Sequence, residues 1–198
     1  MNVDYVVVGI YQENCYIVEK EGHYLVIDPG SRYDKILAKL PEGVKADAIL
    51  LTHGHVDHIG AVDKLVKLWH CPVYVSKEDS FMVRDPYLNI SNAMNIVVRS
   101  PLTILDEGEL VIGPFTIQVL RTPGHTSGSV VFQIENALFT GDTLFHLSVG
   151  RTDLPSGNSS ELKNSLAYLK TLDPSFLIYP GHDDFSTLEE EIFHNPYL

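Results

Sequence analysis

The chain has 198 residues, a 44% share of hydrophobic residues and a formal net charge of −12 at pH 7. This length and apolar content predict one core and a single domain over residues 1–198. The acidic balance argues against a nucleic-acid partner. The chain also has no apolar run of roughly 18 residues and no signal-peptide pattern, so we expect a cytoplasmic protein without a membrane partner.

Three short apolar segments open the chain, and turns rich in Gly, Asn and Glu separate them, which indicates strands. The predicted strands cover residues 4–8, 15–19 and 24–28. A helix is predicted from Tyr33 to Leu40, because Pro41 lies just beyond its end. Another helix is predicted from His58 to His70, where apolar residues recur at helical spacing after the strand-like run 48–51. Those residues are Ile59, Val62, Leu65, Val66 and Trp69.

The second half of the chain continues this alternation of strands and helices. A strand is predicted at 73–75, a short helix at 77–83, and further strands within 103–120, at 129–134 and at 137–140. The irregular stretch 84–100 either covers a binding site or is an inert connection.

Two late helices carry start signals. One begins near Asn158, with Glu161 completing a capping box and three leucines turned inward, and the other begins near Ser186, with Glu189 in the matching position. The inward leucines are Leu162, Leu166 and Leu169. This order of elements predicts an α/β protein of the α+β type, in which sheets pack together and helices lie outside.

Residues 52–58 read Thr-His-Gly-His-Val-Asp-His and follow the buried run 48–51 directly. Three imidazoles and a carboxylate thus lie within six residues, at the end of a predicted strand. Neutral imidazole suits zinc, iron or manganese, and aspartate can bridge two metals. Taken alone, the segment could also be a histidine-rich surface loop.

Three further turns have the same design, in which an apolar strand is followed by glycine and then by His or Asp. Glycine brings the backbone close, so that one side chain projects from the end of the strand. The side chains presented in this way are His125, Asp142 and His182. Since core packing does not explain this repetition, the sequence predicts a shared metal centre.

The ordered ligand-type residues resemble those of the metallo-β-lactamase superfamily. Within it, the chain is most similar to the glyoxalase II-like hydrolases, that is, the hydroxyacylglutathione hydrolases and their short relatives. The similarity runs from segments 13–16 and 26–30 to 195–197, and segment 142–155 points to the short relatives. The resemblance implies a four-layer αββα sandwich with metals in a cleft along one edge of the sheets.

The resemblance also implies which residues hold two divalent metal ions. It assigns one set to a first ion, a second set to another ion, and Asp142 as the bridge between them. The first set is His53, His55 and His125, and the second is Asp57, His58 and His182. Zinc is expected, with iron and manganese as alternatives. A hydroxide bridging the metals would attack an acyl carbon, with Asp57 or Asp142 as the catalytic carboxylate that moves the proton.

The expected substrate is a small molecule, most simply a small thioester such as a 2-hydroxyacyl thiol. The chain stops sixteen residues after His182, so we expect no C-terminal helical glutathione-binding domain, and segment 150–155 lacks the basic-aromatic form of the glutathione-binding enzymes. The thiol carrier therefore stays open. One alternative is a persulfide dioxygenase with a single iron held by His53, His125 and Asp142. The others are hydrolysis of another ester, lactone, phosphodiester or β-lactam, and a metal-binding protein without turnover.

Three residues near the ligand motifs have two readings each. His146 either contacts substrate or is a surface or supporting histidine. Arg151 either reaches an anionic substrate or pairs with Asp153. Asp183 either constrains the turn after His182 or adds negative charge near the second metal. The sequence does not indicate an oligomeric state.

Overall fold

The structure is a computed structural model that describes residues 1–198, and its strands form two six-stranded sheets. In the first sheet β1, β2 and β3 are antiparallel, whereas β3 to β6 run parallel. Its strands, in spatial order, are β1 (Asn2–Val8), β2 (Glu13–Lys20), β3 (His23–Ile27), β4 (Ala48–Leu50), β5 (Val73–Ser76) and β6 (Thr103–Leu105).

The second sheet is a meander of four antiparallel strands extended by two further strands. β10 pairs with β11 in parallel, and β11 pairs with β12 in the antiparallel sense. Its strands are β7 (Gly108–Ile112), β8 (Phe115–Arg121), β9 (Val130–Ile134), β10 (Ala137–Gly141), β11 (Leu177–Pro180) and β12 (Ser186–Thr187). Since β8, β10 and β11 point the same way, their carboxyl ends meet at one edge of the sheet.

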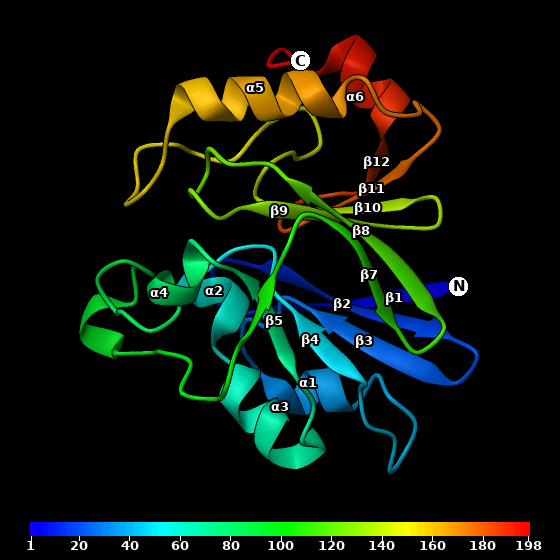
Figure 1. The fold of residues 1–198 in the computed structure, drawn as a ribbon, viewed down its shortest axis with the longest axis vertical. Coiled ribbons are helices and arrows are strands. Elements are labelled where there is room, and N and C mark those ends of the chain that lie inside the picture. Colours follow the sequence, from blue (N-terminus) through cyan, green and yellow to red (C-terminus); the bar gives the residue numbers. More distant parts are fainter.

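The helices cover the outer faces of the two sheets. α5 and α6 lie outside the second sheet, and α1 and α3 lie outside the first, whereas α2 and α4 lie at one end of the sheets (Figure 1). The helices are α1 (Tyr33–Leu37), α2 (Val56–Ile59), α3 (Val62–Trp69), α4 (Asp79–Met82), α5 (Ser159–Leu169) and α6 (Leu188–His194), with one 3₁₀ turn at Asn92–Met94. None of these helices has both the length and the apolar content that crossing a membrane requires.

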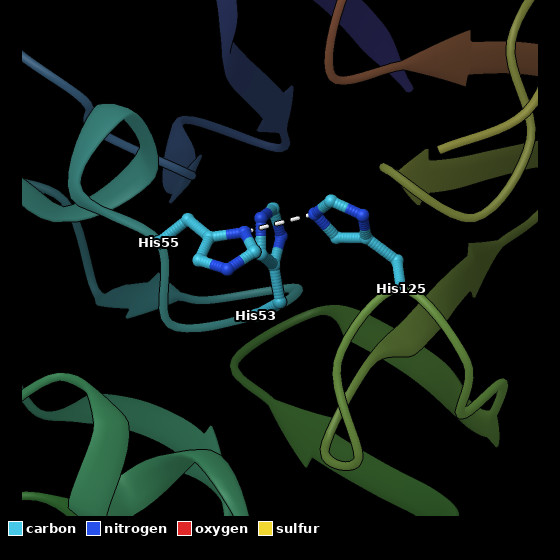
Figure 2. Close-up of side chains that lie close together, drawn as sticks. All are labelled: His53, His55 and His125. Atoms are coloured by element: carbon cyan, nitrogen blue, oxygen red, sulfur yellow. Dashed lines mark hydrogen bonds between the residues drawn. The ribbon is translucent and has the colours of Figure 1, made fainter. Parts of the chain in front are cut away.

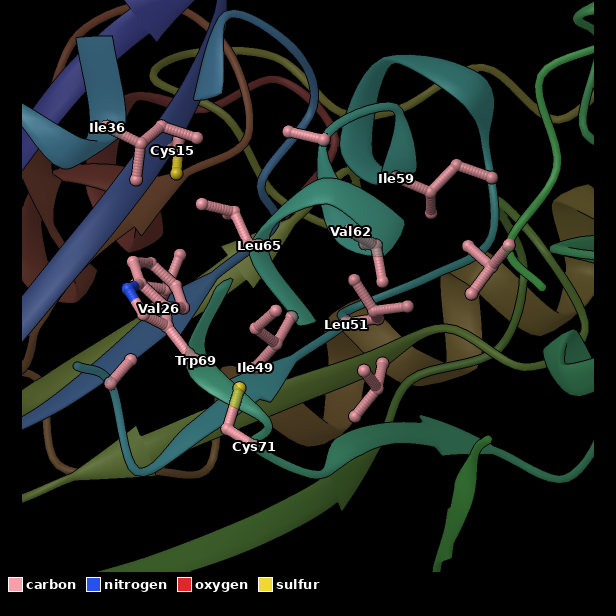
Figure 3. Close-up of a cluster of buried hydrophobic side chains, with 14 of the residues drawn as sticks. Cys15, Val26, Ile36, Ile49, Leu51, Ile59, Val62, Leu65, Trp69 and Cys71 are labelled. Carbon is pink, nitrogen blue, oxygen red and sulfur yellow. The ribbon is translucent and has the colours of Figure 1, made fainter. Parts of the chain in front are cut away.

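Three apolar layers separate the four layers of secondary structure. In β4 the side chains alternate, so that Ile49 joins the cluster under α3 while Leu50 joins the cluster between the sheets. Leu65 and Trp69 of α3 meet Ile49 in the first cluster (Figure 3). A third cluster, with Leu166 of α5, lies outside the second sheet. The predicted helix–sheet–sheet–helix arrangement is therefore present.

The helix predicted over His58 to His70 is wrong as a single element, because two helices occupy this part of the chain. The chain turns at Gly60, where a Cβ atom would lie 2.2 Å from the carbonyl oxygen of Gly30. The next amide, of Ala61, donates to the carbonyl of Pro29 instead of continuing the helix. The first of the two helices also begins earlier than predicted, at Val56.

The start of the last helix was also predicted wrongly. Ser186 lies in β12, where it pairs with Ile178, and the helix begins at Leu188. Thr187 is the N-cap, and its side chain accepts a hydrogen bond from the Glu190 amide. The predicted cap of α5 is confirmed, since the Asn158 side chain accepts hydrogen bonds from the amides of Ser160 and Glu161. The helix predicted to reach Leu40 ends at Leu37.

Candidate metal centre

The four ligand-bearing turns follow β4, β8, β10 and β11, whose carboxyl ends gather at one edge of the sandwich. Glycines allow the close approach that this requires. A Cβ atom on Gly181 would lie 2.4 Å from Asp142 Oδ1, and one on Gly141, which has φ +48°, would lie 2.3 Å from Thr52 Oγ1. A side chain at Gly181 would therefore occupy the space of the candidate ligand Asp142, and one at Gly141 would clash with Thr52, the residue before His53.

The first group consists of His53, His55 and His125, whose ligand nitrogens all lie within 4.8 Å of one another. Their rings point toward one another, and His55 Nδ1 lies 2.8 Å from His125 Nε2 (Figure 2). The other nitrogen of His125, Nδ1, lies 2.7 Å from the carbonyl oxygen of Arg151 and donates to it, which turns Nε2 toward the centre.

Two of these imidazoles, those of His53 and His55, are in the form that binds metal. Burial lowers the pKa of His53 well below its usual value, and nearby His58 lowers it further. Burial and neighbouring His125 lower the pKa of His55 to about 3. Both rings are therefore neutral near pH 7, with a lone pair free for a metal ion.

The second group consists of Asp57, His58 and His182. His182 Nε2 lies 3.3 Å from Asp57 Oδ2, and His58 Nε2 lies 3.9 Å from the same oxygen. His182 Nδ1 donates to the carbonyl of Tyr11 at 3.0 Å, which fixes the orientation of the ring. This group is more open than the first, since the side chains of His182 and Asp57 are 19% and 15% exposed.

Asp142 lies between the two groups. Its Oδ1 is 3.3 Å from His58 Nε2, and its Oδ2 is 3.4 Å from His125 Nε2 and 3.6 Å from His182 Nε2. Burial would raise the pKa of Asp142, but His58 and His125 hold it well below its usual value, so the carboxyl is ionised. The Asp142 carboxylate thus contacts histidines of both groups: Oδ1 faces the second group, and Oδ2 lies between His125 of the first group and His182 of the second.

The centre contains buried polar atoms that no protein group satisfies. His53 Nε2 and His55 Nε2 have no hydrogen-bond partner, and His58 Nε2 and Asp142 Oδ1 lie 3.3 Å apart without the geometry of a hydrogen bond. An unsatisfied buried polar atom is costly, so several of them facing one point indicate a bound cation. The residues therefore fit divalent metal ions.

Asp28 is a functional residue that the sequence reasoning missed, although its segment contributed to the family resemblance. It is 2% exposed, and its Oδ2 lies 3.0 Å from His58 Nδ1 while its Oδ1 accepts from the Thr52 amide. Asp28 can also be grouped with His53 and His58 as a ligand, but it faces the ring nitrogen of His58 that points away from Asp142. A carboxylate in this place orients the histidine and raises its basicity.

Asp79, at the start of α4, is a second residue that was missed. It is fully buried, and its Oδ2 accepts from the Gly54 amide and from Thr126 Oγ1, both at 2.8 Å. Burial raises the pKa of its carboxyl. Because Gly54 and Thr126 lie on the turns that carry His55 and His125, Asp79 ties these two turns together.

The turn that carries His182 is held by β2. The Asn14 side chain donates to the carbonyls of Pro180 and Asp183, and the Asn14 backbone N–H donates to the carbonyl of Gly181. Asp183 has φ +66°, so its backbone conformation and carbonyl shape the turn. No contact of its carboxylate with the second group occurs.

A cavity of about 490 Å³, here called the metal-site cavity, opens over these residues. It is lined by ligand-type residues of both groups together with Tyr11, Ile90 and Arg151. Ile90 comes from the irregular stretch 84–100, which is fastened to α2 because the Val56 amide donates to the carbonyl of Asn89. That stretch therefore lies over the site.

The two candidate substrate residues lie in different places. Arg151 lines the metal-site cavity, and its guanidinium pairs with Asp153 through two contacts of 2.7 Å, with both side chains exposed. His146 does not line the metal-site cavity. Its Nε2 lies 3.5 Å from Glu190 Oε1 on α6.

A sequence comparison gives the family context of this site. The model of the metallo-beta-lactamase superfamily matches residues 8–182. The probable metallo-hydrolase YqgX of Bacillus subtilis is 39% identical over 199 residues, covering 96% of this chain and 94% of that protein. The hydroxyacylglutathione hydrolase GloC of Haemophilus influenzae is 31% identical over 208 residues, covering 100% and 98%.

Solved structures agree in fold. BLEG-1, described as a B3 metallo-beta-lactamase, superposes with a TM-score of 0.95 at 35% identity, covering 100% of this chain and 99% of its own. TTHA1623 in a di-iron-bound form superposes with a TM-score of 0.89 at 38% sequence identity. The match covers 98% of this chain and 100% of TTHA1623. ETHE1 from Myxococcus xanthus superposes with a TM-score of 0.81 at 30% sequence identity. The match covers 99% of this chain and 84% of ETHE1. The predicted fold and the resemblance inferred from the ligand motifs are confirmed.

Proposed function

The chain belongs to the metallo-beta-lactamase superfamily, and on that premise we propose that it is a two-metal hydrolase that cleaves a small thioester. The position of Asp142 carries this proposal. Its carboxylate lies between the two three-residue groups, with Oδ1 3.3 Å from His58 of the second group and Oδ2 3.4 Å from His125 of the first and 3.6 Å from His182 of the second. A single metal ion would use one of these groups and leave the other with unsatisfied buried atoms.

Two divalent ions at such a site supply Lewis acidity, which lowers the pKa of water and stabilises negative charge on a carbonyl oxygen. In the net reaction, water adds to the acyl carbon and the carbon–sulfur bond breaks, which gives a carboxylic acid and a thiol. The reaction needs no nucleophilic side chain, and both cysteines of the chain are buried.

The residues of the chain have distinct roles in this proposal. Asp57 opens to the metal-site cavity, and opposing charges keep its pKa low: burial would raise it, but His58 and His182 lower it. Its carboxylate is therefore ionised and accessible, as a group that accepts the proton of water must be. Asp142 is the other candidate for this step, and Asp28 positions His58.

The relatives support hydrolysis more broadly than they support a thioester. One is called a probable metallo-hydrolase, one a hydroxyacylglutathione hydrolase and one a B3 metallo-beta-lactamase. Thioester cleavage therefore rests on GloC and on the sequence resemblance to short glyoxalase II-like enzymes. Zinc is the metal we propose, with iron as the alternative because TTHA1623 holds a di-iron centre.

A second candidate function is a persulfide dioxygenase with one iron held by His53, His125 and Asp142. The similarity to ETHE1 from Myxococcus xanthus is compatible with it. The complete second group of Asp57, His58 and His182 does not separate the two functions, because the persulfide dioxygenases resemble this motif too. The hydrolase is favoured because segment 154–157, Leu-Pro-Ser-Gly, is more similar to the hydrolases.

The test combines elemental analysis with substrate panels, on protein purified without a His-tag and without oxygen. Two ions per chain and hydrolysis of S-lactoylglutathione would support the proposal. Cleavage of a chromogenic β-lactam in preference to every thioester would replace the substrate class. One iron per chain, with oxygen uptake on glutathione persulfide and no thioester hydrolysis, would establish the second candidate instead.

A further inference from the structure

A second cavity opens beside the metal-site cavity. Its volume is about 510 Å³, and we call it the apolar cavity. Tyr11 and Asp57 line both cavities, so the two spaces adjoin at the second ligand group. A molecule that reaches Asp57 from the metal-site cavity can therefore extend into the apolar cavity.

Three separate segments supply apolar side chains to this second cavity. Val7, Ile10 and Tyr11 come from the end of β1 and the turn after it, Val56 from α2, and Met94 and Ile96 from the irregular stretch 84–100. Several of them are exposed to an unusual degree, with Ile10 at 83%, Met94 at 55% and Tyr11 at 52%. Large apolar side chains gathered around a concave surface next to a reaction centre indicate binding of an apolar group.

The polar groups of the apolar cavity do not offer a built site for a charged ligand. The Arg32 guanidinium is already paired with Asp34, with Nη2 to Oδ2 at 2.8 Å. Lys35 is exposed, so its ammonium stays in water at the rim. The metal-site cavity differs because ligand-type histidines and carboxylates line it. The Arg151 guanidinium at its rim is paired with Asp153, as that of Arg32 is with Asp34. The two cavities therefore suit the two ends of a substrate that is apolar on one side of the scissile bond and polar on the other.

We propose that the apolar cavity binds the acyl group of the substrate, and that this group is a hydrocarbon chain or ring larger than lactoyl. The proposal rests on the thioesterase function proposed above and names its substrate class. A lactoyl group would leave most of a 510 Å³ cavity unfilled, whereas small-molecule sites enclose most of their ligand. The polar thiol carrier then occupies the metal-site cavity on the side of Arg151.

The first experiment compares acetyl, lactoyl and hexanoyl thioesters of one thiol, N-acetylcysteamine, on metal-loaded protein. We expect kcat/KM for the hexanoyl ester to exceed that for the acetyl ester by at least about tenfold, because each methylene placed in an apolar pocket adds binding in the transition state. Equal values for the three esters, or a preference for acetyl or lactoyl, would overturn the proposal.

Two variants place a charge in the apolar cavity at exposed positions, where folding is little affected: Ile10→Asp and Met94→Asp. Each should lower the ratio of hexanoyl to acetyl kcat/KM by about tenfold or more. The matched control is Val111→Asp on β7, which changes an exposed aliphatic residue outside both cavities (61% exposed) and should leave the ratio unchanged. Equal losses on both esters in the two cavity variants would contradict the proposal.

Direct binding separates this proposal from the function on which it rests. In titrations followed by NMR or calorimetry, hexanoate should bind the metal-loaded protein more tightly than acetate, and Met94→Asp should abolish the difference. If no thioester is hydrolysed but hexanoate binds in this way, the thioesterase function fails while the apolar cavity keeps its assignment. If thioesters are hydrolysed and hexanoate binds no better than acetate, the assignment of the cavity is wrong and the function stands.

Discussion

The two ligand groups of the centre differ in chemistry and in access to solvent. The first is made of three imidazoles, each at most 2% exposed, and burial lowers the pKa of two of them. The second contains a carboxylate and two imidazoles. Burial alone would lower the pKa of His58 and His182, but neighbouring carboxylates raise both. His182 and Asp57 also face the cavities, where substrate would enter.

This difference suggests a division of labour between the two halves of the centre. The first group is buried, and burial keeps two of its three imidazoles neutral, which fits an ion that stays in place. The second group has negative charge and an open side, which fits an ion that works with the substrate. Asp142 joins the two, so a change at Asp142 should affect both halves, whereas changes elsewhere should affect one.

The largest effect is expected for Asp142→Ala, because it removes the carboxylate that both groups share. Activity on the best thioester should fall by about 10²- to 10³-fold or more, and both ions should be held less tightly. Steady-state kinetics and metal analysis measure the two effects. Asp106→Ala, at an exposed aspartate away from the site, is the control. Full metal content with wild-type activity in Asp142→Ala would remove Asp142 from the centre.

Asp28→Asn should weaken only the second half. Asparagine can still accept from the Thr52 amide but no longer offers a carboxylate to His58 Nδ1, and loss of such a partner costs about 10- to 100-fold in metal affinity or activity. Titration of metal into the metal-free variant should show one site close to wild type and one weakened site. Equal weakening of both sites would contradict the division of the centre, and Asp106→Asn should change neither.

The two ions should also differ in how readily a chelator removes them. The second group is more exposed, so a chelator should take its ion first and leave a one-ion form. A dialysis series with increasing chelator, monitored by elemental analysis and by activity, tests this. The wild-type protein should pass through a plateau near one ion per chain. A direct fall from two ions to none would show that the halves do not differ in access.

Asp79→Ala removes the carboxylate that connects the turns of His55 and His125 in the first group. It should act mainly on the free energy of unfolding. It leaves the Gly54 amide and the Thr126 hydroxyl without their buried acceptor, at a cost of about 1–3 kcal/mol in the free energy of unfolding. Urea unfolding of the metal-free protein measures this cost. Since the turns of His55 and His125 lose their connection, the first ion should also be held less tightly. A stability equal to that of Asp106→Ala would show that the connection contributes nothing.

The smallest effect is expected for Arg151→Ala. The ion pair with Asp153 is exposed, with side-chain exposures of 63% and 67%, and such pairs contribute about 0–1 kcal/mol. The backbone carbonyl that holds His125 remains, so metal content should not change. A rise in KM for thioesters of glutathione, without the same rise for esters of N-acetylcysteamine, would give the Arg151 side chain a role at the polar end of the substrate.

The ligand-type residues could be predicted from sequence because local patterns mark them. A strand, a glycine and then His or Asp is a short-range signal, and it led to His125, Asp142 and His182. Asp28 and Asp79 carry no such signal. Their roles arise from contacts with residues such as Thr52, Gly54 and Thr126, which lie far along the chain. Such contacts exist only once the sheets have assembled.

The errors in the fold have the same origin. The helical spacing from Ile59 to Trp69 is real, yet the chain bends at Gly60 because Gly30 of another segment lies against it. The last helix starts one residue later than predicted, with Thr187 in place of Ser186 as its N-cap, because Ser186 pairs with β11. In both places a tertiary contact outweighs a local preference. Apolar periodicity predicted packed sheets with helices outside, because it indicates which faces are buried, whereas the four-layer order was implied by the family resemblance.

The most direct test of a two-ion centre around Asp142 is anomalous X-ray diffraction from crystals of the metal-loaded protein, measured at the absorption edge of the metal. The predicted result is two peaks on opposite sides of the Asp142 carboxylate, one among His53, His55 and His125 and the other among Asp57, His58 and His182. A single peak at full metal saturation would contradict the two-metal hydrolase and favour a one-metal enzyme.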